Sequence, residues 1–180
     1  MAEQNSFNFK ESFKEFGYYL VNFFLSILIG LGVMILLDVP MKFIKGFPIN
    51  LGHFIIHFFG MCIALYIRSY HQGYDQNTRT YTFQLKKTII YVGIVFAVQA
   101  ALILIIGGHA IYITGPTTSL TSYLLPAVDT TTISGALKLT GYNWLFMILA
   151  DVFIYAPIMV ISEHFGAKRN LEDVTQSQQK

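Results

Sequence analysis

Residues 143–162 read NWLFMILADVFIYAPIMVIS, and Asp151 carries the only charge in this run of twenty residues. The hydrocarbon core of a bilayer is about 30 Å thick, so a helix needs about 20 mainly apolar residues to cross it. The run ends at Glu163, with Lys168 and Arg169 close behind, as expected where a helix leaves the membrane. This stretch is therefore predicted to be a transmembrane helix.

Three earlier stretches have the same length and character, at about 17–37, 49–67 and 88–108. Of the 180 residues, 54% are hydrophobic and only 12% are charged, which is about half the charged share of soluble domains. The aromatic share of 16% is the reverse of a disordered composition. The sequence predicts an all-α integral membrane protein with four transmembrane helices, and it excludes a water-soluble globular enzyme.

Lysine and arginine are distributed unevenly between the two sides that these spans define. Nine of the twelve lie on the side of the N-terminus, the second loop and the C-terminus, and three lie on the other side. Cytoplasmic loops carry the excess of positive charge, so both termini are predicted to be cytoplasmic. We expect a multi-pass protein of a cell membrane, and its size and topology suggest the cytoplasmic membrane of a bacterium.

The chain is expected to have three segments. Residues 1–16 form an amphipathic N-terminus at the cytoplasmic interface, 17–166 form the transmembrane domain, and 167–180 form a polar cytoplasmic tail. The connection between the third and fourth spans, 109–142, has 34 residues, far more than the usual loop. It is too apolar for an open linker, so we expect it to fold back over the outer mouth of the bundle, with a short helix near 134–139.

Asp151 is the residue within the spans that most needs an explanation. An aspartate at a helix centre costs about 2.5–3.5 kcal/mol on insertion scales, and intramembrane ionisable groups are functional-site candidates by default. At a rise of about 1.5 Å per residue, His57 and Gln99 lie at nearly the same depth as Asp151. We predict a polar centre with His57 as the first partner of Asp151 and Gln99 as the second. Its residues are Asp151, His57, Gln99, His53 and Tyr155.

Small and polar residues recur on the first two spans at helical spacing. Asn22, Ser26 and Gly30 follow one another at steps of four, and Gly60 lies among small and polar residues on one face of the second span. Helices in lipid associate through such residues, because lipid gives them no hydrophobic reason to meet. This stripe is predicted to pack helix against helix, either inside one chain or against a second copy.

His53 and His57 have the spacing that places two imidazoles on one helical face, and Asp151 could add a third metal ligand. The pattern alone is weak evidence, because packed or outward-facing histidines explain it as well. Cys62 is the only cysteine, and the chain contains no Walker, G-x-S-x-G, H-E-x-x-H or C-x-x-C motif. We expect no bound metal or cofactor and no enzymatic activity.

The leading functional hypothesis is a small transporter, or the membrane subunit of a transport assembly, whose polar centre responds to protons or ions. Four spans enclose little space, so we expect a homo-oligomer or a membrane-protein partner within the lipid bilayer, and no nucleic acid. An alternative is a non-catalytic scaffold that binds partners through the outer loop, with Asp151 only a hydrogen-bonding link between helices. A third is a membrane-embedded metalloenzyme.

Overall fold

The computed structural model contains helices and no strand among the residues that it describes. Those residues are 9–44, 46, 48–75, 85–106, 115–125, 128 and 132–178. Four helical stretches are long and apolar enough to cross a membrane, namely Ser12–Lys42, Ile49–Asp75, Leu85–Ile105 and Ile133–Gln178. This confirms an all-helical protein with four helices able to span a membrane. The side of the membrane that each end faces, and the division into three segments, stay predictions.

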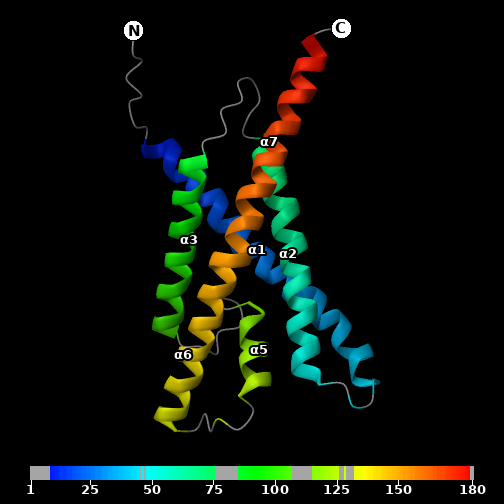
Figure 1. Ribbon diagram of the computed structural model, residues 1–180, viewed down its shortest axis with the longest axis vertical. Helices are drawn as coiled ribbons and strands as arrows, with labels where there is room; N and C mark the ends of the chain where they lie inside the picture. The colour runs from blue at the N-terminus through cyan, green and yellow to red at the C-terminus, as the bar shows by residue number, and fades with distance from the viewer. Residues whose placement is uncertain are drawn as a thin grey trace.

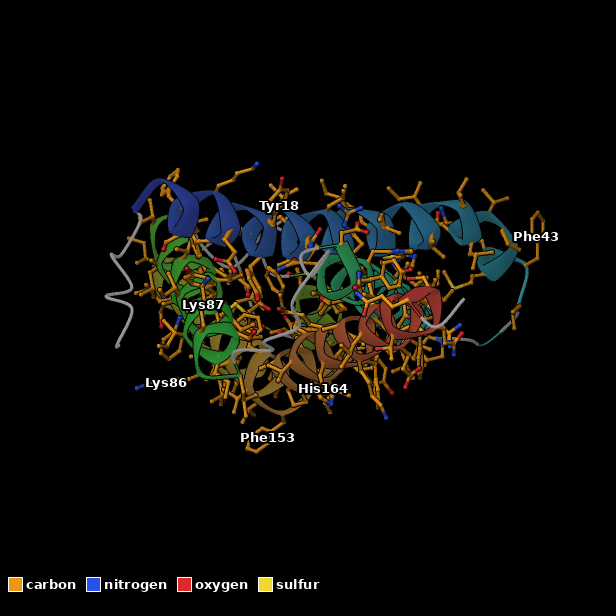
Figure 2. The ribbon with its side chains drawn as sticks, turned by 90° about the horizontal axis from the view of Figure 1, so that it is seen from above. Tyr18, Phe43, Lys86, Lys87, Phe153 and His164 are labelled. Atoms are coloured by element: carbon orange, nitrogen blue, oxygen red, sulfur yellow. The ribbon has the colours of Figure 1, made fainter. Side chains whose placement is uncertain are left out.

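The elements are α1 (Phe9–Lys42), α2 (Ile49–Asp75), α3 (Leu85–Ile106), α5 (Thr117–Leu124), α6 (Ile133–Ala150), η1 (Asp151–Tyr155) and α7 (Ala156–Gln178). α6, η1 and α7 form one continuous helix along the length of the molecule, and α1 crosses it obliquely (Figure 1). Seen from above, α1 lies along one edge and α7 on the opposite side (Figure 2). α2 packs against both and holds them together.

The fourth membrane helix begins earlier than the sequence predicted. The predicted start was near 143, whereas α6 begins at Ile133, where the hydroxyl of Thr132 accepts a hydrogen bond from the backbone N–H of Gly135 at 3.1 Å. The short helix expected near 134–139 is therefore the start of α6 and not a separate element. Bilayer thickness limits only the apolar part of a helix, whereas capping residues decide where the helix itself begins.

Two glycines bring α2 and α7 into close contact at the end of the bundle that holds the C-terminus. A Cβ added to Gly73 would lie far inside contact distance of the carbonyl oxygen of Glu163. A Cβ added to Gly166 would likewise meet the carbonyl oxygen of Tyr70. Because small residues allow membrane helices to approach each other, this pair of glycines determines how α7 lies on α2.

α5 lies among the long helices, packed against α2 and α6 (Figure 1). Gly115, two residues before α5, has a φ of +61°, which favours glycine. A Cβ at this position would lie 3.5 Å from Sδ of Met61 and 3.7 Å from the side chain of Ile27. Both neighbours belong to the buried core near the middle of their helices. α5 therefore begins deep in the bundle, and its eight residues are too few to cross a membrane.

The polar side chains of α5 are buried by the bundle. Thr117, Ser119 and Thr121 are buried, and Asn143 on α6 donates a hydrogen bond from Nδ2 to Oγ1 of Thr118 at 3.2 Å. This packing explains how a stretch too polar for bare contact with lipid is accommodated beside the membrane helices. Much of the remaining connection lies outside the described residues, so its covering of the outer mouth stays a prediction.

Candidate functional site

Asp151 and Tyr155 are the first and last residues of η1, and each is only 1% exposed. Phe153, between them, points away from the bundle (Figure 2). Within the described part of the chain, neither carboxylate oxygen of Asp151 has a hydrogen-bond partner, and neither has the hydroxyl of Tyr155. Two polar side chains, one turn apart, are thus buried without a side-chain hydrogen bond to any described residue.

η1 is a π-helical turn, and Pro157 accounts for its position. Proline has no backbone N–H to donate to the helix, so the regular bonding pattern cannot continue through it. Just before the proline, the backbone N–H of Ala156 donates to the carbonyl oxygen of Asp151, five residues back instead of four. Single π turns inside α-helices occur frequently at functional sites.

Apolar and aromatic side chains surround the buried hydroxyl of Tyr155. The ring centroid of Tyr155 lies 6.4 Å from that of Phe23 on α1 and 6.1 Å from that of Phe58 on α2. The half-buried Cys62 packs against the same core. Such surroundings supply no hydrogen bonds to a charge, so an ionised carboxylate beside them is costly.

His57 is fully buried on α2, and its ring is bonded to α1 instead of Asp151. Its Nε2 donates to the backbone carbonyl oxygen of Ile27 at 3.0 Å. Gly30 leaves the necessary room, since a Cβ there would lie 2.8 Å from the ring of His57. Nδ1 of His57 has no hydrogen-bond partner among the described residues. No hydrogen bond joins His57 to Asp151 in the described structure, so their joint action stays a prediction.

Gln99 is buried on α3, with 1% of its surface exposed. α3 packs against α1, α6 and α7, so this side chain faces protein instead of lipid. Three of the five residues expected at the polar centre, Asp151, His57 and Gln99, are thus buried, each on a different helix. Their burial is compatible with a common centre, but hydrogen bonding does not bring Asp151 and His57 together.

His53 lies away from the polar centre, where α1 and α2 approach their connection. Its Nε2 lies within hydrogen-bond distance of Oδ1 of Asp38, at 2.7 Å, and Lys42 forms an ion pair with the same carboxylate. Among the residues that the structure describes, no group of three His, Cys, Asp or Glu side chains could hold a metal ion. His53, His57 and Asp151 therefore do not form the weak metal site considered from the sequence.

The small and polar stripe of α1 faces α2 of the same chain. Asn22 donates from Nδ2 to Oε1 of Gln72, and the buried Ser26 donates to the carbonyl oxygen of Asn22 at 2.6 Å. A Cβ on Gly30 would lie 2.7 Å from a backbone carbonyl oxygen of α2, and a Cβ on Gly60 would lie 3.1 Å from Cα of Gly30. A second copy of the chain would therefore need a different surface.

A second buried acid, Glu163, was not expected from the sequence, which placed it at the end of a span. Its Oε1 accepts hydrogen bonds from the hydroxyl of Tyr19 at 2.7 Å and from Oγ1 of Thr88 at 3.2 Å. These bonds join α7 to α1 and α3. Three steps of four residues lead from Asp151 to Glu163, so the continued helical period was the signal that could have revealed a shared buried face.

Four apolar helices around a buried acid define a multi-pass α-helical membrane protein. The chain matches no protein-family model, no curated protein and no solved structure. Its function must therefore be inferred from the geometry of its own residues, and the buried carboxylate of Asp151 is the clearest chemical feature among them.

Proposed function

We propose that this protein is a small transporter, or the membrane subunit of a transport assembly, in which Asp151 takes up and releases a proton. The observation that carries the proposal is the Asp151 carboxylate, which is buried in a membrane-spanning helix without a hydrogen-bond partner among the described residues. Carboxyl groups at such depth serve as proton relays in pumps and transporters. We therefore assign the proton-carrying role to Asp151.

A purely structural role for Asp151 would require a hydrogen bond from its carboxyl group to another helix, and the described residues provide none. Polar residues stabilise helix packing in membranes through bonds across helices, each worth about 0.6 kcal/mol on average. Insertion of an aspartate costs about 2.5–3.5 kcal/mol. With no such bond among the described residues to offset this cost, packing gives no reason for an acid at this position. A functional reason is favoured.

Two interruptions of regular helix support the same proposal. One is the π turn η1, which contains Asp151, and the other is the turn at Gly115, which lies against the core just before α5. Irregular backbone at membrane depth is tolerated where protein buries it or where it lines a cavity. Discontinuous helices form the substrate and ion sites of many transporters.

The proposal requires the site to open. Asp151 lines neither of the hollows of about 600 and 540 Å³ between α1 and α2. In this proposal the described structure is taken as the closed state. In the open state, the hydroxyl of Tyr155 is expected to donate to the Asp151 carboxylate or to a bound substrate. Opening and closing around a fixed central site is the usual form of alternating access.

The substrate is unidentified, so the first test follows the proton itself. Infrared difference spectra are recorded on protein in nanodiscs while the pH of the medium is changed. We expect a carboxyl C=O band that changes with pH in the unmodified protein and is missing from Asp151→Asn. Two variants serve as controls. Glu163→Gln removes the second buried acid, and Glu172→Gln removes an exposed acid.

A second test measures function. In proteoliposomes with an internal pH dye, Asp151→Asn should lower proton entry driven by an imposed gradient to the level of empty liposomes, while Glu172→Gln should leave it unchanged. If the infrared band persists in Asp151→Asn and proton entry is unaltered, the proposal is wrong. The scaffold hypothesis would then be favoured if a deletion within residues 116–139 also abolished the co-purification of partner proteins.

We also infer that transport involves more than one copy of the chain or a membrane-protein partner. Four spans form a thin bundle, and Asn22 and Gly30 of the small and polar stripe of α1 are already used against α2. Exposed apolar side chains on the outer faces of the helices leave room for lipid or for another subunit. Crosslinking in native membranes, followed by mass determination, distinguishes a single chain from an assembly.

A further inference from the structure

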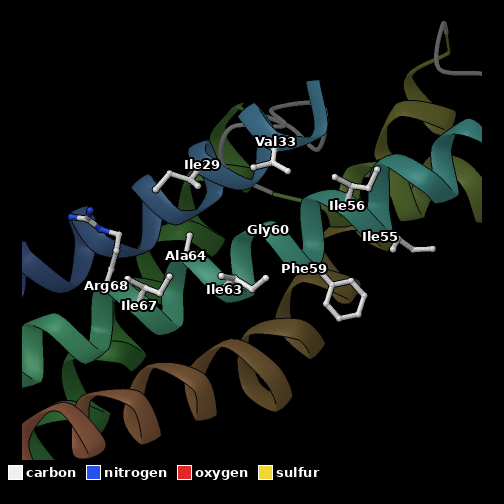
Figure 3. A pocket seen from close by; sticks show the side chains of 10 residues that line it. All are labelled: Ile29, Val33, Ile55, Ile56, Phe59, Gly60, Ile63, Ala64, Ile67 and Arg68. Carbon is white, nitrogen blue, oxygen red and sulfur yellow. The ribbon is translucent and has the colours of Figure 1, made fainter. Parts of the chain in front are cut away.

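A groove of about 600 Å³ lies between α1 and α2 on the surface of the bundle (Figure 3). Nine of its ten lining residues are apolar or glycine, and the tenth is Arg68. The nine are Ile29, Val33, Ile55, Ile56, Phe59, Gly60, Ile63, Ala64 and Ile67. An apolar groove with a single cation at one end has the polarity of an amphiphile.

The length of the groove matches one leaflet of a bilayer. Its lining extends along α2 from Ile55 to Ile67, which is about 18 Å at the rise of an α-helix. The hydrocarbon core of a bilayer is about 30 Å thick, so one leaflet takes up about 15 Å. Arg68 follows Ile67 directly and therefore lies where a lipid headgroup begins.

Arg68 has the charge and geometry to bind a phosphate. Its Nε donates to Oδ1 of Asn22 at 3.0 Å, which orients the guanidinium group. In the described part of the chain, Arg68 forms no ion pair with an acidic side chain. Arginine presents several N–H groups in one plane and suits the paired oxygens of a phosphate.

A second hollow of about 540 Å³ continues beyond the groove and shares Ile67 and Arg68 with it. Its other lining residues carry polar groups, and they are Tyr18, Asn22, His71, Gln72 and Asp75. This hollow can donate and accept hydrogen bonds, as a polar headgroup requires. Asp75 is its acidic lining residue and should weaken the binding of an anion.

We propose that this groove binds one membrane phospholipid with an anionic headgroup. The acyl chain lies along the apolar lining, the phosphate lies at Arg68, and the rest of the headgroup occupies the polar hollow. A free phosphate would use Arg68 but leave the apolar groove unexplained, and a neutral apolar molecule would leave Arg68 without a counter-charge. The proposal does not depend on the transport function of Asp151.

The test is native mass spectrometry of the full chain after lipid removal in detergent. The probes are dioleoylphosphatidylglycerol, dioleoylphosphatidylcholine and inorganic phosphate. We expect one phosphatidylglycerol per chain, bound about fivefold more tightly than phosphatidylcholine, and no measurable binding of phosphate alone. Arg68→Gln should remove this preference, while Arg169→Gln, which affects an arginine already paired with Glu172 and Asp173, should keep it.

A second variant, Asp75→Asn, distinguishes a loss of lipid binding from a loss of folding. This change removes the opposing charge, so phosphatidylglycerol should bind about twofold more tightly. Damage to the fold would weaken binding in every variant and could not produce opposite signs at Arg68 and Asp75. Equal binding of the two lipids, or unchanged binding by Arg68→Gln, overturns the proposal. So does binding of phosphate alone at the same affinity, or a lipid-free dimer that occupies the groove.

Discussion

Two buried acids on the same continuous helix differ in what surrounds them. Glu163 accepts hydrogen bonds from Tyr19 at 2.7 Å and Thr88 at 3.2 Å, whereas the carboxylate of Asp151 has no partner among the described residues. Their exposed fractions are similar, at 6% and 1%. Burial alone therefore does not separate a structural acid from a functional one. What distinguishes the two carboxylates is their hydrogen bonding among the described residues.

The neighbouring elements explain this difference. Around Glu163 the helices are drawn together, because Gly73 and Gly166 allow close contact of α2 with α7. An ion pair between Glu15 and Lys87 also joins α1 to α3 at this end. Around Asp151 the helix is interrupted by a π turn and no described side chain reaches the carboxylate. The helix is therefore held by close packing and hydrogen bonds near Glu163, whereas the Asp151 carboxylate contributes no such bond among the described residues.

The largest effect on stability is expected from a substitution that disrupts the close contact of α2 with α7 near Glu163. Gly73→Ala places a Cβ against the backbone of Glu163, so α7 must move away from α2 and lose the bonds of Glu163. Overpacking of this kind should lower the free energy of unfolding by about 3 kcal/mol. Denaturant unfolding in detergent, followed by the fluorescence of the single tryptophan Trp144, measures the change.

Gly141→Ala is the matched control for Gly73→Ala. No atom lies within 4 Å of an added Cβ at Gly141, so the substitution should leave stability unchanged or slightly higher. If Gly73→Ala were as stable as the control, α7 could shift without cost. The close contact would then not be what holds Glu163 in its bonded position.

A smaller effect of opposite sign is expected at Asp151. Asp151→Leu removes a buried polar group that bonds nothing among the described residues, and it should raise the free energy of unfolding by about 2 kcal/mol. Proton transport should be lost in the same variant, so stability and activity move in opposite directions. The same unfolding assay and the proteoliposome assay measure the two. A loss of stability would mean that Asp151 is a structural residue like Glu163.

The smallest effect is expected at Glu163. Glu163→Leu removes the carboxylate that accepts from Tyr19 and Thr88, whose hydroxyls lie 3.2 Å apart and can still bond each other. The substitution should lower the free energy of unfolding by about 1 kcal/mol. Glu163→Gln should lose less, because an amide oxygen can still accept both bonds. A double-mutant cycle with Tyr19→Phe should be non-additive. Additive losses would show that the Tyr19–Glu163 bond does not contribute to stability.

Part of the candidate site was predictable from the sequence. Asp151, His57 and Gln99 were expected to lie inside the bundle, and all three are buried. Their similar depth in the membrane is predicted from the constant rise of a helix per residue, and it stays a prediction. Their hydrogen-bond partners could not be predicted, because the depth of a side chain does not determine which neighbouring helix it faces. His57 thus bonds to the carbonyl oxygen of Ile27, and Glu163 was missed.

The sequence by itself determined that the chain has four helices long and apolar enough to span a membrane, because apolar length compared with bilayer thickness is a property of each segment alone. Only the tertiary structure decided that α6 begins at Ile133 and that α5 starts inside the core. It also decided that, among the described residues, the carboxylate of Glu163 is hydrogen-bonded and that of Asp151 is not. These outcomes depend on contacts between segments distant in the chain. The period of a helix predicts which residues share a face, but the packing of the other helices decides what that face meets.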